Sequence, residues 1–424
     1  MKQIINNLRQ NTLENITLFL VLLLTFLLPI SKKPVPLTII LLAVFTIILL
    51  IKKKSFNKIK LTGIHIGLIV LYILYAIGII YSENIKAGLF DIEIKMSFLA
   101  LPLIMAALTQ FINKDFYNKI LSAFVVGMTV SVIYSFIRAS YNYFQNRDIS
   151  EFLYAKLSSA FHPSYFSMYL NFAIIILVYK IFANQNSYKL SKKIFLSFLV
   201  LLFFTTIILV NSKAGILISI ISVFILLLQQ LFKLKNKLTA ISFIILCALF
   251  IIFVWSKVPT VKHRFLVSIA ALEKYKLEKN INPEEGTVQR IVIWKHSVKA
   301  IKEKPLFGYG TGDLHETLDK HFKEGKFFHG ITTHLNCHNQ YLQTAVCIGI
   351  TGLMVLLFIL IALFYKGFRL KEPIIIFFAL IISLHFLFES MLETQAGIIF
   401  ISFFISLFGI LKKENTNSLK AESF

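Results

Sequence analysis

The sequence predicts an all-α polytopic membrane protein with about twelve transmembrane helices and one large external loop between spans nine and ten. Of its 424 residues, 57% are hydrophobic and 15% are charged, whereas soluble domains carry roughly a quarter charged residues. Apolar stretches of about twenty residues recur along the whole chain, and each is long enough to cross a hydrocarbon layer of about 30 Å. These observations exclude an ordinary soluble globular protein.

The apolar stretches define the spans, and the placement of lysine and arginine defines their orientation. A net charge of +23 would suit nucleic-acid binding, but the cations gather in alternate short connections, for example residues 52–60 and 233–237. Cations in short loops mark the cytoplasmic side. We therefore expect both termini in the cytoplasm, membrane lipids around the spans, and no nucleic-acid partner. The predicted spans are residues 16–31, 35–51, 62–82, 95–112, 118–142, 162–183, 194–211, 214–232, 239–257, 339–365, 373–392 and 396–411.

The spans divide the chain into four parts. Residues 1–257 hold spans one to nine, residues 258–338 form an external, partly helical loop domain, residues 339–411 hold spans ten to twelve, and residues 412–424 form a polar cytoplasmic tail. The first span is flanked like a signal peptide but lacks a small-residue cleavage site, so we expect a retained helix. Of the three cysteines only Cys337 lies outside the spans, which predicts no internal disulfide.

The long loop contains a predicted helix from Thr287 to Lys304. Apolar residues recur at helical spacing along one of its faces, and Arg290 lies one turn before Trp294. Such a helix can lie along the membrane surface with the tryptophan at headgroup depth.

A glycine-rich segment, "PLFGYGTGD", follows this helix and holds Gly308, Gly310 and Gly312. It is not a phosphate-binding loop, because no strand precedes it and no Gly-Lys-Ser/Thr follows. We predict a tight turn between two helices.

The start of span ten joins a polar stretch directly to an apolar helix. On a continuous helix, His338, Tyr341, Ala345, Gly349 and Gly352 fall on one face. The small residues would let another helix approach closely. His338 is then either an interfacial cap on a packing helix or a rigidly held base, since histidine side chains ordinarily titrate near pH 6.5.

Nearby histidines raise the alternative of a zinc site. The spacing of His329, His334 and His338, with Cys337 beside them, is tolerable for a metal. The carboxylate that usually orients such ligands is not apparent nearby in the sequence. We therefore predict no metal and no cofactor.

Cations and further polar residues are expected at the external rim. Lys213 lies in the short connection between spans seven and eight, Lys95 begins span four, and Arg290 lies on the loop helix. Each alone is typical of a snorkelling anchor. Together they could surround an anionic group, because lysine and arginine supply both charge and hydrogen-bond donors.

Two other groups of residues belong to the same rim. His162 and Tyr165 lie at the external start of span six, and His385, Glu389 and Glu393 recur every four residues on one stripe of span eleven. The carboxylates are either solvated surface groups or ligands for sugar hydroxyls and partners that polarise a base.

These motifs together resemble the O-antigen ligase superfamily, which includes O-antigen polymerases and protein O-oligosaccharyltransferases. His338-Asn339, a nine-residue gap, Gly349 and Gly352 are similar to the family's His-Asn pattern. The segment "RIVIWKHSVKAIKEKPLFGYGTG" is similar to the family's Arg-Trp-Pro-Leu-Phe-Gly-Tyr-Gly segment, and "NSKAG" places Lys213 where arginine is usual. The motif-bearing part covers roughly residues 200–400.

The resemblance implies a reaction and roles for the residues. A glycan would pass from an undecaprenyl-pyrophosphate carrier to an acceptor hydroxyl at the outer, periplasmic face of the bacterial inner membrane, by an inverting displacement without metal. His338 would be the general base, and Arg290 and Lys213 would hold the pyrophosphate. Further substrate contacts are expected from Asn339, Trp294, Tyr341, His162, Tyr165 and Glu389, and structural roles from Gly349, Gly352, Gly308 and Gly310.

Two alternatives remain open. A transporter of lipid-linked glycans also has about twelve spans, but such proteins carry polar groups near the membrane midplane, and here the polar chemistry collects at one rim. Within the transferase class, lipid A–core is the acceptor of a ligase and another carrier-linked repeat that of a polymerase. We rank the ligase first and the polymerase second.

Overall fold

The computed structural model describes residues 2–158, 160–184, 187–233, 241, 245, 259–277 and 285–412. Every element among these residues is a helix, which confirms the predicted all-α class. The α-helices are α1 (Lys2–Leu27), α2 (Val35–Lys53), α3 (Gly63–Ile80), α4 (Ile85–Lys95), α5 (Ser97–Leu108), α6 (Lys114–Asn146), α7 (Tyr154–Ser158), α8 (Pro163–Ala183), α9 (Leu190–Val210), α10 (Lys213–Lys233), α12 (Pro259–Leu277), α13 (Gly286–Glu303), α14 (Leu314–Glu324), α15 (Phe328–Thr332), α16 (Gln340–Leu370), α17 (Pro373–Phe388) and α18 (Gln395–Ile410).

Six helices are long and apolar enough to cross a membrane: α2, α3, α6, α8, α9 and α16. Shorter apolar stretches lie at residues 12–27, 213–229, 373–388 and 395–410. Each of these segments coincides with a predicted span. Predicted span nine, residues 239–257, lies outside the described residues apart from positions 241 and 245. The total of twelve spans therefore stays a prediction.

Predicted span four differs from the structure. In place of one helix over residues 95–112, α4 ends at Lys95 and α5 covers only Ser97–Leu108. A helix of 12 residues is about 18 Å long, which is less than the hydrocarbon thickness. The Lys95 side chain explains the break in register, because it is fully buried against the carboxylates of Asp91 and Glu393. This ion pair holds the junction of α4 and α5 at the polar end of the bundle.

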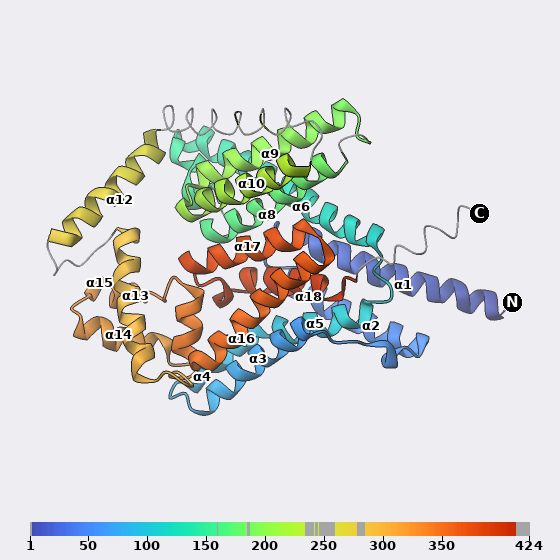
Figure 1. Ribbon diagram of the computed structural model, residues 1–424, viewed down its shortest axis with the longest axis horizontal. Coiled ribbons are helices and arrows are strands. Elements are labelled where there is room, and N and C mark those ends of the chain that lie inside the picture. The colour runs from blue at the N-terminus through green and yellow to red at the C-terminus, as the bar shows by residue number, and fades with distance from the viewer. Residues whose placement is uncertain are drawn as a thin grey trace.

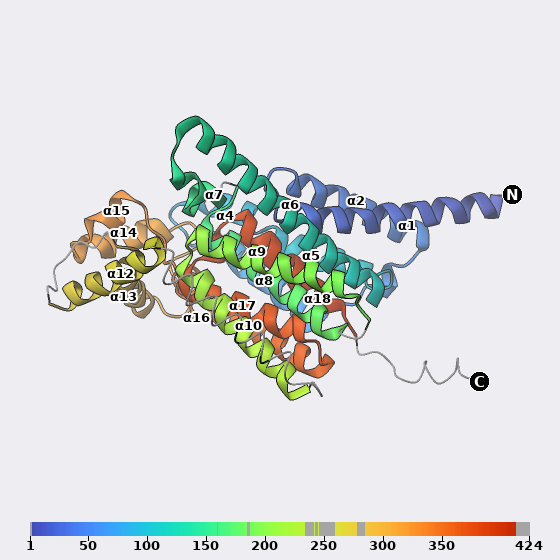
Figure 2. The ribbon, with the colours of Figure 1, turned by 90° about the horizontal axis from the view of Figure 1, so that it is seen from above.

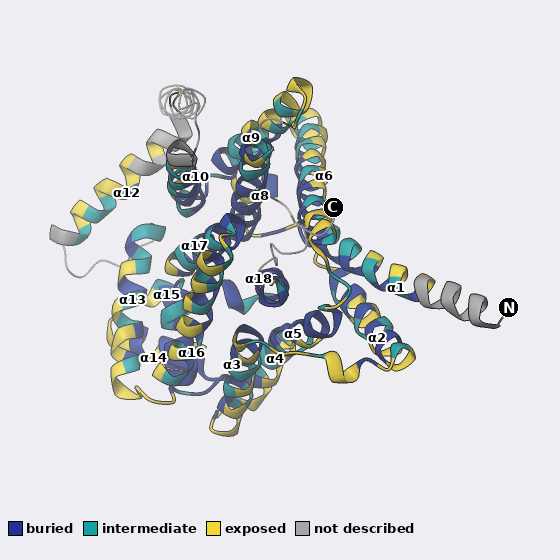
Figure 3. Cartoon of the chain, turned by 45° about the vertical axis from the view of Figure 1, so that its right-hand side comes forward, coloured by how far each residue is buried: buried dark blue, intermediate teal, exposed yellow. Residues whose placement is uncertain are grey.

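The core of the bundle is built around α18. All the residues from Ala396 to Ile410 are buried, and the helix lies in the middle of the other helices (Figure 3). Its phenylalanines meet those of α8 and α17, with ring centroids 4.8 Å apart for Phe172–Phe404 and 5.2 Å apart for Phe378–Phe408. Edge-to-face pairs of this kind add to the burial of large apolar side chains.

The outer helices expose apolar side chains instead of polar ones. Ile80 is 82% exposed, Phe144 68% and Ile361 66%. A water-soluble surface rarely carries so many large apolar groups, whereas hydrocarbon around a bundle requires them. The exposed surface therefore agrees with the membrane location that the hydropathy predicts.

One end of the bundle carries the polar structure. Helices α12–α15 project beyond this end, and the first residues of α1 point away from it (Figures 1 and 2). We call it the loop end. The connection between α17 and α18, residues 389–394, and the first residues of α8 and α16 meet there through the contacts described below. Which side of the membrane the loop end faces stays a prediction.

Candidate active site at the loop end

Glu389 is the centre of the polar cluster at the loop end. Helix α17 ends at Phe388, and Glu389 has an extended backbone with φ −156° and ψ 148°. Its side chain is only 7% exposed. One carboxylate oxygen, Oε1, lies 2.8 Å from Nδ1 of His338. The other, Oε2, accepts from the Ser164 hydroxyl at 3.3 Å and lies 3.9 Å from a guanidinium nitrogen of Arg290.

His338 is held in a strained position immediately before α16. Its φ is +43°, in the left-handed region that non-glycine residues seldom adopt. The Asn336 side chain accepts from its backbone N–H at 2.9 Å. The Glu389 carboxylate can only accept a hydrogen bond, so Nδ1 of the neutral His338 ring carries the proton and donates it to Glu389. Nε2 is then left as an acceptor. The side chain is 26% exposed, so Nε2 is available to a substrate.

The surroundings keep Glu389 ionised. Burial raises the pKa of this carboxyl, but the hydrogen bond and charge of His338, with the charges of Arg290 and His162, lower it to about 2. A carboxylate that stays negative at neutral pH stabilises an imidazolium that forms beside it during a reaction. The pair can therefore accept a proton at Nε2 and stabilise the resulting imidazolium.

Arg290 reaches this site from α13. Its Nε donates to the Phe388 carbonyl at 3.1 Å, and a terminal nitrogen donates to the Gly286 carbonyl at 3.2 Å. The side chain is 31% exposed. These bonds fix the guanidinium beside Glu389 and leave part of it exposed, and its predicted binding of an anion stays a prediction.

His162 and Tyr165 contribute from the start of α8. His162 is the N-cap residue, and its ring accepts from Ser164 N–H at 3.4 Å. Burial lowers the pKa of His162, Glu389 raises it, and the charges of His338, Arg290 and Lys32 lower it further. Tyr165 donates its hydroxyl to the Ser390 carbonyl at 3.1 Å. The structure thus brings both residues to the cluster, with Tyr165 engaged in fixing the connection that carries Glu389.

Asn339 and Tyr341 bind protein groups beside His338. Asn339 caps α16, since its side chain accepts from Leu342 N–H at 3.1 Å and donates to the Leu387 carbonyl at 3.2 Å. Tyr341 donates to the Ser383 carbonyl at 3.0 Å. Both side chains tie the start of α16 to the end of α17. This arrangement indicates positioning of His338, and direct substrate contact stays a prediction.

Lys213 is paired with the N-terminal end of α13. Its amine donates to Glu285 Oε1 at 2.8 Å, to Thr287 at 3.2 Å and to Ser268 of α12. Burial raises the pKa of Glu285, but the hydrogen bonds of Lys213 and Ser268 and the Thr287 N–H lower it to about 2. Lys213 therefore anchors the helix that carries Arg290, and its expected direct contact with a pyrophosphate stays a prediction.

Trp294 lies one turn after Arg290 on α13 and is half-buried. It lines a surface groove with four other residues of the same helix: Lys295, Val298, Lys299 and Lys302. The groove has a volume of about 420 Å³. The structure thus places Trp294 on a basic outer surface, and its predicted substrate contact stays a prediction.

The predicted glycine seam on span ten is wrong in its geometry. Helix α16 breaks at Ile348 (φ −127°, ψ 20°) and Gly349 (φ 70°, ψ −171°), so Gly349 and Gly352 do not continue the face of His338. A Cβ on Gly349 would collide with the Leu306 carbonyl, because the segment Pro305–Gly310 is docked against the break.

Backbone hydrogen bonds explain why this docking occurs. The break frees carbonyls and N–H groups of α16, and buried backbone groups need partners. The glycine-rich segment supplies them, and Gly308 (φ 70°) and Gly310 (φ 114°) adopt the conformations that this requires. The bonds are Ile350 N–H to Pro305 O at 2.8 Å, Tyr309 N–H to Val346 O at 2.9 Å, and Gly310 N–H to Cys347 O at 2.9 Å. The segment that follows α13 is therefore a loop held against α16 by backbone hydrogen bonds, and not only the tight turn that the sequence predicted.

The predicted carboxylate stripe of span eleven is also wrong. Because α17 ends at Phe388, Glu393 does not follow Glu389 around a helix. Glu393 instead binds Lys95 at 3.1 Å. His385 is buried and its Nδ1 bonds to the Ile381 carbonyl at 2.9 Å. Lys95 is fully buried, so it cannot join Arg290 and Lys213 around an anion.

His329, His334, His338 and Cys337, the residues of the alternative zinc site, do not form a metal-binding group. Among the described residues, no group of three or more histidine, cysteine, aspartate or glutamate side chains could hold a metal ion. Cys337 is buried and accepts from the Ser297 hydroxyl at 3.3 Å, while the His334 side chain is 75% exposed and lies 3.8 Å from Asp319.

Sequence reasoning missed the residues that hold the 389–394 connection. Gln340 accepts from Leu392 N–H at 2.7 Å, and Gln343 accepts from Cys337 N–H at 3.1 Å and from the Ser390 hydroxyl at 3.3 Å. Two glutamines three residues apart in an apolar helix were a usable signal, because polar side chains inside a membrane bundle need partners.

Comparison with known proteins adds two findings. A family model described as O-antigen ligase matches residues 198–357. This range contains Lys213, Arg290 and His338 and ends before Glu389. A stretch of 90 residues, 21% of this chain, is 33% identical to an uncharacterized protein of Haemophilus influenzae, and the match spans 22% of that relative's length.

Proposed function

We propose that this chain is a membrane glycosyltransferase of the O-antigen ligase superfamily, and the match of that family's model to residues 198–357 supports the proposal. The donor is a glycan on an undecaprenyl-pyrophosphate carrier, and the acceptor is a hydroxyl group. The reaction takes place at the periplasmic face of the inner membrane, with both termini in the cytoplasm. The observation that carries the proposal is the imidazole of His338 between a buried, ionised Glu389 and solvent.

His338 removes the acceptor proton. Its Nε2 takes the proton of the acceptor hydroxyl while that oxygen forms a bond to the anomeric carbon. The bond between this carbon and the carrier phosphate breaks at the same time, and the pyrophosphate leaves with the electron pair. The imidazolium is stabilised by Glu389 at 2.8 Å and later returns its proton to water. Displacement from the opposite face inverts the anomeric configuration.

Arg290 stabilises the charge on the leaving group. Its guanidinium is 31% exposed and is fixed by two backbone carbonyls, so it does not have to reorganise during the reaction. Preorganised cations aimed at a developing anion are a large source of rate acceleration. Lys213 acts indirectly: its ion pair with Glu285 fixes the N-terminal end of α13, the helix that carries Arg290.

The acceptor decides between two members of the superfamily. We rank lipid A–core as acceptor first, which makes the protein an O-antigen ligase, and another carrier-linked repeat second, which makes it a polymerase. A third alternative, from a different class, is a transporter that moves the lipid-linked glycan without covalent change.

A reconstituted assay separates these functions. Purified protein in vesicles is given undecaprenyl-pyrophosphate-linked glycan, with and without lipid A–core, and the products are resolved by mass. Glycosylated lipid A–core supports the ligase, and longer carrier-linked chains support the polymerase. Movement of the donor across the vesicle with no new glycosidic bond would refute glycosyl transfer.

Variants of two histidines test the assigned base. His338→Ala should abolish transfer and leave expression intact. His334→Ala is the matched control, because His334 has a similar backbone conformation, φ +48°, four residues away in the same loop but points into solvent. Near-normal transfer by His338→Ala would remove the base assignment.

A further inference from the structure

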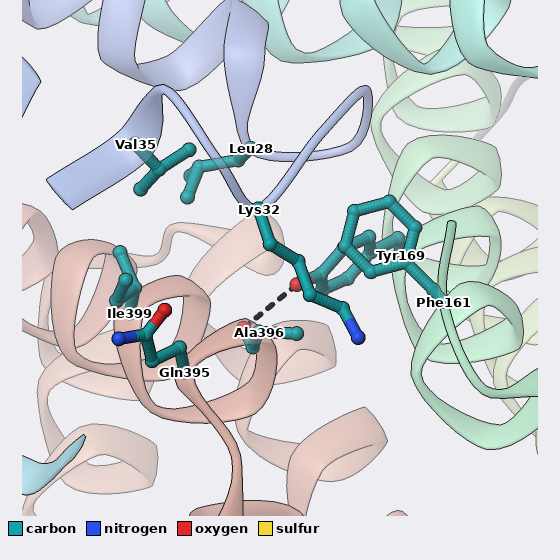
Figure 4. A pocket seen from close by; sticks show the side chains of 8 residues that line it. All are labelled: Leu28, Lys32, Val35, Phe161, Tyr169, Gln395, Ala396 and Ile399. Carbon is teal, nitrogen blue, oxygen red and sulfur yellow. Dashed lines mark hydrogen bonds between the residues drawn. The ribbon is translucent and has the colours of Figure 1, made fainter.

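A small apolar pocket with a lysine at its mouth lies beside the candidate active site. Figure 4 shows the Lys32 side chain reaching from the connection between α1 and α2 across the pocket toward Phe161 and Tyr169. The depression holds about 210 Å³ of empty space, part of which is open to solvent. Its apolar walls are Leu28, Val35, Phe161, Tyr169 and Ile399.

The pocket and the active site share two segments of chain. Phe161 lines the pocket, and His162, the next residue, lies within the electrostatic reach of Glu389 and Arg290. The connection that carries Glu389 leads directly into Ala396, whose carbonyl accepts from Tyr169 at 2.7 Å inside the pocket. A ligand whose charged end lies at Arg290 can therefore have its neighbouring atoms in this pocket.

Lys32 supplies a charge at the mouth. It is exposed, and its amine lies 5.5 Å from the centre of the Phe161 ring. Among the residues that the structure describes, no carboxylate forms an ion pair with it. Its positive charge reaches His162, whose pKa it lowers after the larger effects of burial and the nearby charged groups. A cation and an aromatic wall are thus within one side-chain length of each other.

We propose that this pocket binds the carrier lipid of the donor at its phosphate end, with Lys32 on the pyrophosphate and the first isoprene unit against Leu28, Phe161 and Ile399. This inference rests on the proposed function and names a lipid subsite for it. The Lys32 amine is 5.5 Å from the centre of the Phe161 ring, so a ligand that contacts both must carry its hydrocarbon next to its phosphate. A polyprenyl pyrophosphate meets this requirement, because its hydrocarbon begins at the phosphate oxygen. A phospholipid has polar glycerol esters between phosphate and hydrocarbon, so it would place polar groups against the apolar walls.

Binding of short ligands to the full-length protein in detergent tests the subsite directly. Geranyl pyrophosphate carries the phosphate and isoprene units without a glycan, and inorganic pyrophosphate lacks the hydrocarbon. We expect geranyl pyrophosphate to bind at least 10-fold more tightly, since a few buried CH₂ groups contribute about 0.8 kcal/mol each. Lys32→Ala should weaken its binding about 10-fold, the lower range for a charge-assisted hydrogen bond.

Lys33→Ala is the matched control, because Lys33 is the neighbouring exposed lysine and does not line the pocket. It should bind geranyl pyrophosphate like the wild type. In the transfer assay, Lys32→Ala should raise the donor KM about 10-fold, consistent with the same charge-assisted bond, and leave kcat nearly unchanged.

Each result has a defined meaning. Equal behaviour of Lys32→Ala and Lys33→Ala, in an enzyme that transfers glycan, overturns the subsite and leaves the proposed function standing. Displacement of geranyl pyrophosphate by phosphatidylglycerol vesicles with the same dependence on Lys32 also overturns it, since the pocket is then a phospholipid site. Lysine-dependent binding of geranyl pyrophosphate without transfer supports the subsite and refutes the transferase. Absence of binding and of transfer in the wild type overturns both.

Discussion

Replacement of Glu389 by glutamine tests the central pair of the site. The amide keeps the size of the side chain and removes its charge, so the 2.8 Å contact with His338 Nδ1 loses its charge-assisted character. Hydrogen bonds to charged groups contribute roughly 1.5–3 kcal/mol. If this stabilisation develops as the imidazole becomes charged in the transition state, transfer should slow by about 10- to 150-fold, at 1.36 kcal/mol for each factor of ten.

The pKa of Glu389 agrees with a strong interaction between its carboxylate and the neighbouring cations. Burial alone would raise this pKa, whereas His338, Arg290 and His162 together lower it to about 2, below the value of about 4.3 for an ordinary glutamate. The glutamine variant loses this interaction together with the charge.

Initial rates of glycan transfer at saturating donor measure the effect. Glu389→Gln should lower kcat with little change in donor KM, and Glu324→Gln, at a surface ion pair with Lys299, should be silent. The double variant His338→Ala/Glu389→Gln should be no slower than His338→Ala alone, because residues that act as a unit are not additive. Full activity of Glu389→Gln, or additive losses in the double variant, would refute the pair.

Three further predictions concern stability. Gly349→Ala should lower the midpoint of thermal unfolding and reduce transfer, since the backbone conformation of Gly349 costs a non-glycine residue roughly 1–3 kcal/mol. Gly63→Ala is the control and should be tolerated, because a Cβ at Gly63 meets only a 3.7 Å contact. Lys95→Met should destabilise by about 3 kcal/mol, the lower end of the range for broken buried pairs, because two half-buried carboxylates lose a fully buried partner. Lys299→Ala at an exposed pair should cost about 0–1 kcal/mol. The stabilising effect of Glu285, seen as the difference from Glu285→Gln, should be complete above an unfolded pKa of about 4.3 and disappear as the pH falls toward about 2.

The sequence predicted helix positions well because hydropathy measures the main constraint on a membrane bundle. Ten apolar stretches can be recognised without any knowledge of their neighbours, and their helices fall where the stretches do. The candidate site residues His338, Arg290, His162 and Glu389 are also predictable as polar residue types at the ends of predicted spans or in the long loop. Their pairing was not predictable, because His338 and Glu389 are 51 positions apart and the two apolar helices between them, α16 and α17, determine which residues meet at this end of the bundle.

Local periodicity failed where a helix stops earlier than its hydropathy does. The predicted stripe from His385 to Glu393 requires a continuous helix, but α17 ends at Phe388. The predicted seam from His338 to Gly352 also requires a continuous helix, but α16 breaks at Gly349. In both cases the backbone groups that the helix releases are met by another segment of the chain. The periodicity of apolar and polar residues predicts which side chains share a helix face. It contains no information about which distant segments will hydrogen-bond to the backbone.

The break in α16 explains how a loop and a membrane helix can form one rigid site. Arg290 is at the start of α13, and the segment after α13 is bonded to both sides of the break in α16. His338 is at the start of α16, and the glutamines that follow it hold the connection that carries Glu389. The cation, the imidazole and the carboxylate are therefore linked through α16, although they belong to three separate segments. A continuous helix would have closed its own hydrogen bonds at residues 346–351 and left the loop segment without partners. Gly349 thus matters to the site because it interrupts the helix, which is the opposite of the close helix packing that the sequence pattern predicted.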